Sequence, residues 1–175
     1  MFKDELRRED YTLSADDEAV LHAFGAFFKS ECTIQRVRAA TPLGFDADLY
    51  GLMISMGAIE MAGITPDSGG ATLLQLALLA EEFGRALAPA PLIEAIVVRR
   101  ALVGASSPEA ERRAQLIESG RSIPAFSAQP LDAPGRHLLS TGAIADCVLG
   151  LRQGTLVLLE VDPAPHVPNL GAGPL

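Results

Sequence analysis

Apolar residues recur every three or four positions along the first two thirds of the chain, and this spacing predicts a series of helices. The first helix is expected to begin after Ser14, because a serine cap followed by acidic residues suits the positive end of a helix. Its polar side chains, among them Asp17, Glu18 and Lys29, are expected to stay in water. Four residues form its buried face: Val20, Phe24, Phe27 and Phe28.

The strongest helical pattern lies between Thr72 and Leu87. Its apolar residues spread so far around the helix that we expect burial on most faces, at the centre of the domain. Leu76, Leu79 and Phe83 are expected to be almost fully buried there. Further patterns predict helices from near Asp46 to Gly57 or Gly63, through Ile93 to Leu102, and from Ser107 to Gly120.

The pattern changes from helical to strand-like after Gly120. The dipeptide Gln153-Gly154 predicts a hairpin turn, because glycine accepts the positive φ that such turns require. The predicted fold class is α+β, with an all-helical N-terminal domain of about five helices followed by a reduced antiparallel β segment. Three runs rich in aliphatic and β-branched residues predict its strands: Ile123 to Ser127, Ile144 to Leu151 and Thr155 to Val161.

The same change of pattern predicts the domain boundaries. Residues 14–120 form the predicted helical domain, and residues 121–162 form a partial β domain. Residues 163–175, rich in proline and glycine, are expected to form a tail without regular structure. So few strands leave open sheet edges, which suggests an interrupted fold and an oligomer with itself or with a larger partner.

Charge and composition exclude several classes of partner. The net charge of −8 repels phosphate backbones and anionic membranes, so neither nucleic acid nor a membrane surface is an expected partner. No apolar run reaches the roughly 20 residues needed to span a bilayer. The start carries no targeting signal, so the protein is expected in the cytoplasm with Cys32 and Cys147 reduced. Solvated helix faces are the expected place of three basic pairs: Arg7-Arg8, Arg99-Arg100 and Arg112-Arg113.

A dense set of residues between Met56 and Glu94 carries a family resemblance. A short helix is followed by a proline-acid-x-x-Gly-Gly turn and a helix that contains Glu-Glu-x-Gly-Arg and ends near Ala-Pro. In this order the segment resembles the acyl-CoA dehydrogenases. The matching residues are Pro66, Asp67, Gly69, Gly70, Glu81, Glu82, Gly84, Arg85, Leu87, Ala88, Pro89 and Pro91.

The resemblance covers most of Ser14 to Asp162, with two departures. Residues 142–146, Gly-Ala-Ile-Ala-Asp, are similar to the family's Gly-Ala-x-x-Ala-Asp stretch. The Thr-Glu-x-x-x-Gly-Ser-Asp stretch that wraps the flavin is expected after Phe126, but residues 127–134 do not supply it. The C-terminal helical bundle that holds the family's proton-abstracting glutamate has no counterpart, so no catalytic residue is assigned.

The resemblance implies a flavin-dependent system of fatty-acid oxidation and lipid metabolism. A family member is an oxidoreductase that binds FAD, oxidises the α,β-bond of an acyl-CoA thioester and passes electrons to an electron-transfer flavoprotein. Ser127 and Gln129, at the end of the first strand, are the expected contacts to a flavin edge. The isolated chain is expected to be inactive. The alternative is a non-catalytic partner subunit, or a truncated remnant, that packs against a full-length dehydrogenase.

Other candidate sites have simpler explanations. Glu81 and Glu82 are expected to pair with Arg85 on their own helix rather than to act as an acid–base pair. The glycines at 69 and 70 are expected to form a turn, because the segment lacks the spacing of a phosphate-binding loop. Metal binding is not expected, because no two histidines share a helix face at ligand spacing: His22, His137 and His166.

Overall fold

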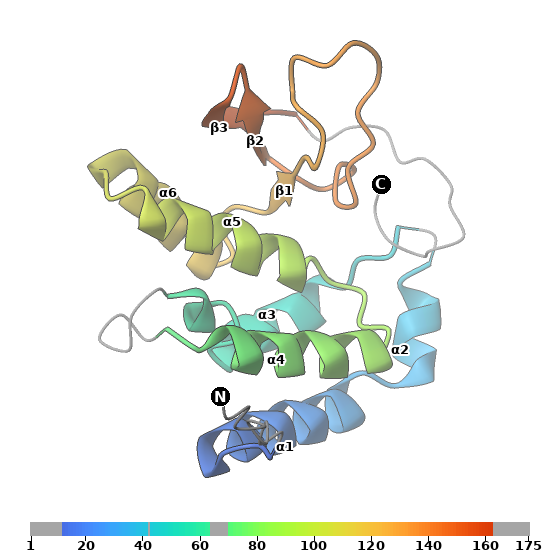
Figure 1. Cartoon of the computed structure of the whole chain (residues 1–175). Helices are drawn as coiled ribbons and strands as arrows, with labels where there is room; N and C mark the ends of the chain where they lie inside the picture. The colour runs from blue at the N-terminus through green and yellow to red at the C-terminus, as the bar shows by residue number, and fades with distance from the viewer. Residues whose placement is uncertain (1–11, 42, 64–69, 163–175) are drawn as a thin grey trace, which may run out of the picture.

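The described residues, 12–41, 43–63 and 70–162, contain six α-helices, one short 3-10 helix and three strands in a computed structural model (Figure 1). The predicted α+β class is confirmed. Every predicted helix is present, and α2 is an additional helix that the sequence analysis did not predict. The elements are α1 (Ala15–Glu31), α2 (Ile34–Ala39), α3 (Ala47–Ser55), η1 (Glu60–Ala62), α4 (Leu73–Arg85), α5 (Leu92–Gly104), α6 (Pro108–Glu118), β1 (Pro124–Phe126), β2 (Cys147–Arg152) and β3 (Thr155–Glu160).

The helices lie in layers beneath the sheet. Figure 1 shows α1 at the bottom, α3 and α4 above it, α5 and α6 next, and the strands at the top. The contacts agree with this view, because α1 packs on α4, whereas α5 contacts α6, η1 and β1. Helix α5 therefore joins the helical layers to the sheet.

The first helix begins where its cap predicts. The Ser14 hydroxyl accepts a hydrogen bond from the Asp17 backbone N–H at 3.2 Å, and the Asp17 carboxylate accepts from the Ser14 backbone and hydroxyl at 3.2 and 2.6 Å. This capping box encloses Asp17, so the prediction that its side chain stays in water was wrong. Phe24 and Phe28 are buried as predicted, while Val20 and Phe27 are half-buried.

Helix α4 is not the centre of the core. Leu76 and Leu79 are buried as predicted, but Phe83 is only half-buried. Leu73 is 74% exposed, and Leu74 is also exposed, so the prediction of burial on most faces was wrong. The apolar residues at the start of α4 lie beyond the reach of the neighbouring helices.

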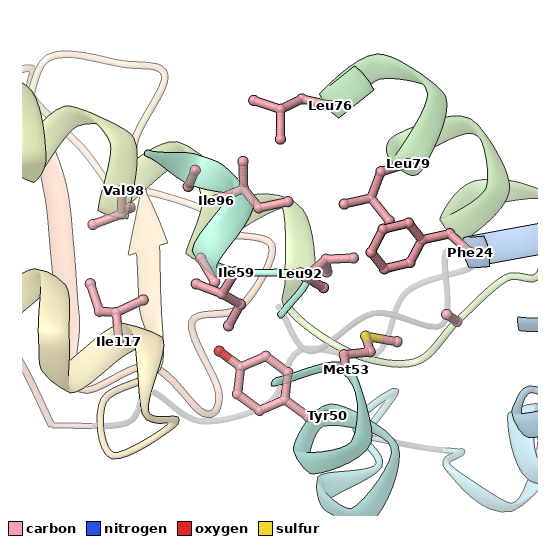
Figure 2. Packing of buried hydrophobic residues seen from close by; sticks show 14 of the residues in the cluster. Phe24, Tyr50, Met53, Ile59, Leu76, Leu79, Leu92, Ile96, Val98 and Ile117 are labelled. Atoms are coloured by element: carbon pink, nitrogen blue, oxygen red, sulfur yellow. The ribbon is translucent and has the colours of Figure 1, made fainter. Parts of the chain in front are cut away.

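The core is centred instead on α5. Leu92, Ala95 and Val98 of this helix are fully enclosed. Figure 2 shows Leu79 of α4 directed toward Phe24 of α1, with Leu92 of α5 and Ile59, just before η1, in the next part of the cluster. The same cluster includes Leu149 of β2, with Phe126 and Leu158 packed against it, so the core continues from the helices into the sheet.

The sheet is mixed, with the order β1-β2-β3. Strands β2 and β3 are antiparallel as predicted, whereas β1 runs parallel to β2, with Pro124 opposite Cys147. The predicted hairpin turn is confirmed, since Gln153 and Gly154 both have positive φ, at 50° and 77°. Parallel pairing requires a long connection, and residues 127–146 provide it.

The basic pair Arg99-Arg100 does not lie on a solvated helix face, as was predicted from the sequence, because Arg99 is buried. Its side chain is only 9% exposed, and the guanidinium donates to the Glu118 carboxylate at 2.9 and 2.5 Å and to the Glu60 carbonyl at 3.2 Å. The neighbouring Arg100 donates to the Gly63 carbonyl at 2.8 Å. The pair is therefore not a solvated helix face but fastens η1 and α6 to α5.

Candidate functional site

The candidate cofactor contacts lie where β1 ends. The Ser127 backbone N–H donates to the Leu149 carbonyl at 2.8 Å, and the Leu131 N–H donates to the Leu151 carbonyl at 2.6 Å. Residues 128–130 form a loop between these two bonds. The chain therefore stops hydrogen-bonding to β2 after Ser127 and bonds to it again at Leu131. The sequence analysis placed Ser127 and Gln129 at this strand end, and the structure brings them together: the Ser127 hydroxyl donates to the Gln129 carbonyl at 2.7 Å.

Leu131 covers the adjacent part of β2. A Cβ atom at Gly150 would lie 2.7 Å from the Leu131 Cγ atom, so only glycine leaves room for this side chain. Leu131 also packs against a small second core that includes Val148 and Ala125. This contact was not predicted from the sequence, although an isolated glycine inside a strand pattern indicates a close approach.

The side chains of Ser127 and Gln129 differ in how free they are to contact a ligand. The Ser127 hydroxyl proton is committed to the chain's own carbonyl, and the Gln129 side chain is exposed. Neither residue lines the apolar or acidic hollows of this part of the fold.

Residues 142–146 have a structural role at the joint between helices and sheet. The Asp146 carboxylate accepts a hydrogen bond from the Ser122 hydroxyl at 2.7 Å, and the Asp146 N–H donates to the Ile123 carbonyl at 3.0 Å. Nearby, the buried Thr141 hydroxyl donates to the Pro124 carbonyl at 3.2 Å. These bonds hold the entry of β2 beside β1, so Asp146 has a structural role there.

Tyr50 has a buried hydroxyl group that was not among the candidates predicted from the sequence. Its ring is buried, and its hydroxyl has no hydrogen-bond partner within the described part of the chain (Figure 2). Burial, followed by the charge of Glu94, raises the pKa of this phenol, so Tyr50 stays neutral. No sequence signal distinguishes it from an ordinary core tyrosine.

The other sequence candidates have local partners. Arg85 binds Glu81 at 2.6 Å and Glu82 at 3.1 Å, which confirms the predicted ion pairs. His22 is exposed, and the His137 ring lies 3.3 Å from the Ala133 carbonyl. Within the described ranges no group of His, Cys, Asp or Glu side chains could hold a metal ion, and no helix could span a membrane. His166 and part of the Pro-Asp-x-Gly-Gly motif, residues 66–69, lie outside the described residues.

The two thiols should resist alkylation in the folded protein. Burial raises the pKa of Cys147 to about 11 and also raises that of Cys32, and the thiolate is the form that reacts. At pH 8 we expect iodoacetamide to label both residues far more slowly than in guanidinium-unfolded chain, as measured by peptide mass spectrometry. Equal rates in the two states would contradict the buried positions.

No protein-family model matches the chain. One curated protein, acyl-CoA dehydrogenase IpdE2 of Mycobacterium tuberculosis, is 30% identical over 123 residues, which are 69% of this chain and 36% of that protein.

Several solved structures are similar to this chain. A variant of the Tcur3481-Tcur3483 steroid ACAD has a TM-score of 0.71 at 23% identity, over 86% of this chain and 49% of the other. The ChsE4-ChsE5 complex from Mycobacterium tuberculosis has a TM-score of 0.68 at 20% identity, over 86% of this chain and 48% of the other. Butyryl-CoA dehydrogenase from Megasphaera elsdenii has a TM-score of 0.63 at 17% identity, over 86% of this chain and 50% of the other. The chain thus spans about half the length of these solved chains.

Proposed function

Because the chain has the fold of about half of an acyl-CoA dehydrogenase, we propose that it is a member of that family and works in a flavin-dependent system that oxidises the α,β-bond of acyl-CoA thioesters. The observation that carries the proposal is the fold likeness over 86% of the chain, together with the sequence likeness to IpdE2. In this proposal residues 14–120 are the N-terminal helical domain, and residues 121–162 are part of the middle β domain. The location is the cytoplasm.

We further propose that the flavin and the catalytic base are held mainly outside this chain's described residues. The commitment of the Ser127 hydroxyl and the exposure of Gln129 support this view. The end of β1 can contact one edge of a flavin. The exposed Gln129 amide and the lone pairs of the Ser127 oxygen provide this contact. An electron-transfer flavoprotein is the proposed acceptor of the electrons, by family resemblance alone.

A non-catalytic partner subunit is the second candidate, favoured by apolar side chains left in water. Leu73, Leu74 and Leu87 are exposed on or just after α4, where a monomer gains nothing from leucine. Such a subunit, or a remnant with the same surface, would pack against a full-length dehydrogenase. The proposed assembly is a homo-oligomer or a hetero-oligomer.

The purified chain is expected to be colourless and without acyl-CoA oxidation. The measurement is the visible flavin absorption after purification with added FAD, followed by an assay with butyryl-CoA and an artificial electron acceptor. Butyryl-CoA dehydrogenase prepared in the same way is the positive control. Stoichiometric flavin on the isolated chain would show that it holds the cofactor by itself. Co-expression with a full-length dehydrogenase separates the two candidates, because only a subunit co-purifies in a fixed ratio.

A further inference from the structure

A groove runs between the β2–β3 hairpin and helices α5 and α6. Its deeper part is a hollow of about 270 Å³ with mainly apolar walls. Leu156, near the hairpin turn, is 50% exposed at this hollow, and its cross-strand partner Leu151 is exposed as well. The apolar wall is formed by Ala101, Leu102, Ala105, Leu149, Leu156 and Leu158.

The groove continues into an acidic hollow at the end of β3. This second hollow, of about 430 Å³, is lined by the carboxylates of Asp146, Glu160 and Asp162. Arg113 lies between the two hollows and binds both Glu160 and Glu109, the latter at 3.0 Å. The lining of the two hollows has four carboxylates and one guanidinium. Arg112 also binds Glu109, at 2.7 Å, so the groove with its ion-pair partners has an excess of two negative charges.

Ion pairs stabilise two of the charges in the groove, those of Glu109 and Arg113. Hydrogen bonds from Arg112, then from Arg113, lower the pKa of Glu109 to about 2. Hydrogen bonds to Glu160 and Glu109 raise the pKa of Arg113. These ion pairs keep Glu109 and Arg113 charged at neutral pH, and the carboxylates that outnumber the arginines attract cationic groups.

We propose that this groove is a docking site for a segment of a partner protein that presents one aliphatic or aromatic side chain beside lysine or arginine. The apolar hollow is smaller than the roughly 300–1,000 Å³ of an ordinary small-molecule pocket, but it admits a single side chain. The adjoining carboxylates complement the basic residue. A second copy of this chain is a poor occupant, because the chain has a net charge of −8.

The test uses three fluorescein-labelled peptides and the whole chain, with binding followed by fluorescence anisotropy. The sequences are Gly-Lys-Lys-Leu-Phe-Lys-Lys-Gly, its acidic analogue with glutamate for lysine, and a basic analogue with serine for the apolar pair. Only the first peptide should bind at micromolar protein. Equal binding of the two basic peptides would overturn the proposal, because charge alone would then account for binding, and so would failure of the first peptide to bind.

Single substitutions test whether the peptide binds in the groove. Leu156→Asp should weaken binding at least about tenfold, and Glu160→Gln should weaken it about threefold. Leu138→Asp is the matched control, because Leu138 is 75% exposed but outside the groove, and it should leave binding unchanged. Equal losses for Leu138→Asp and Leu156→Asp would overturn the proposal.

Two further measurements keep the test decisive. If Leu156→Asp fails to fold, as judged by circular dichroism, Ala105→Phe replaces it, since a ring at this exposed position should fill the hollow and reduce binding about tenfold. Light scattering measures whether the chain forms a dimer. If it does, and if Leu156→Asp dissociates the dimer, then a second copy of the chain occupies the groove and the proposal is overturned. None of these measurements involves flavin, so they stand or fall independently of the proposed dehydrogenase role.

Discussion

Leu79→Ala should lower the free energy of unfolding by about 2–5 kcal/mol, because it removes most of a fully buried side chain and leaves a cavity between α4 and its neighbours. The side chain has no exposed surface and is directed toward Phe24 in the core cluster (Figure 2). Urea unfolding followed by circular dichroism measures the change.

The matched control is Leu73→Ala in the same helix. Leu73 is mostly in water, so its truncation should change the unfolding free energy by no more than about 0.5 kcal/mol. Similar losses for the two variants would mean that the start of α4 is covered in solution. A loss below about 1 kcal/mol for Leu79→Ala would place α4 outside the core.

Arg99→Met should cost about 3 kcal/mol, which is at the low end for breaking a buried ion pair. The substitution leaves the Glu118 carboxylate and the Glu60 carbonyl without their donor. Glu118 keeps partial contact with water, which moderates the loss. Urea unfolding of the single variants and of the double variant with Glu118→Gln should give a coupling energy above about 1 kcal/mol.

The exposed pair of Arg85 and Glu81 is the comparison. Glu81→Gln should cost less than about 1 kcal/mol, because both side chains of this pair are mostly in water. If Arg99→Met were equally mild, α5 would not depend on Arg99 for its attachment to η1 and α6.

The sequence predicts most of the helices and strands because their local chemistry agrees with the final fold. Ser14 and Ser107 both accept hydrogen bonds as N-caps, and the turn at Gln153-Gly154 has the expected backbone. Helix α2 was missed because six residues carry too few turns for a visible period. The parallel direction of β1 was missed because strand direction depends on the route of the connecting residues 127–146, which leaves no local pattern.

Burial was harder to predict than secondary structure. Leu73 and Leu79 look equivalent in an apolar helix, and only the position of α1 shows that one is covered and the other is not. Arg99 resembles a surface residue until Glu118 and the Glu60 carbonyl are brought to it by tertiary contacts. At the candidate site, sequence placed Ser127 and Gln129 together but could not show that the serine proton is committed locally.

The continuation of the helical core into β2 bears on how the chain acquires its structure. Leu149 supplies part of the packing for the helices, so the helical layers have an unfinished surface until the strands arrive. Pairing Pro124 with Cys147 requires closure of the long loop between them, a contact distant in sequence that forms slowly. We therefore expect the helices to complete their burial late in folding, and the helices and the sheet to unfold together as one cooperative unit.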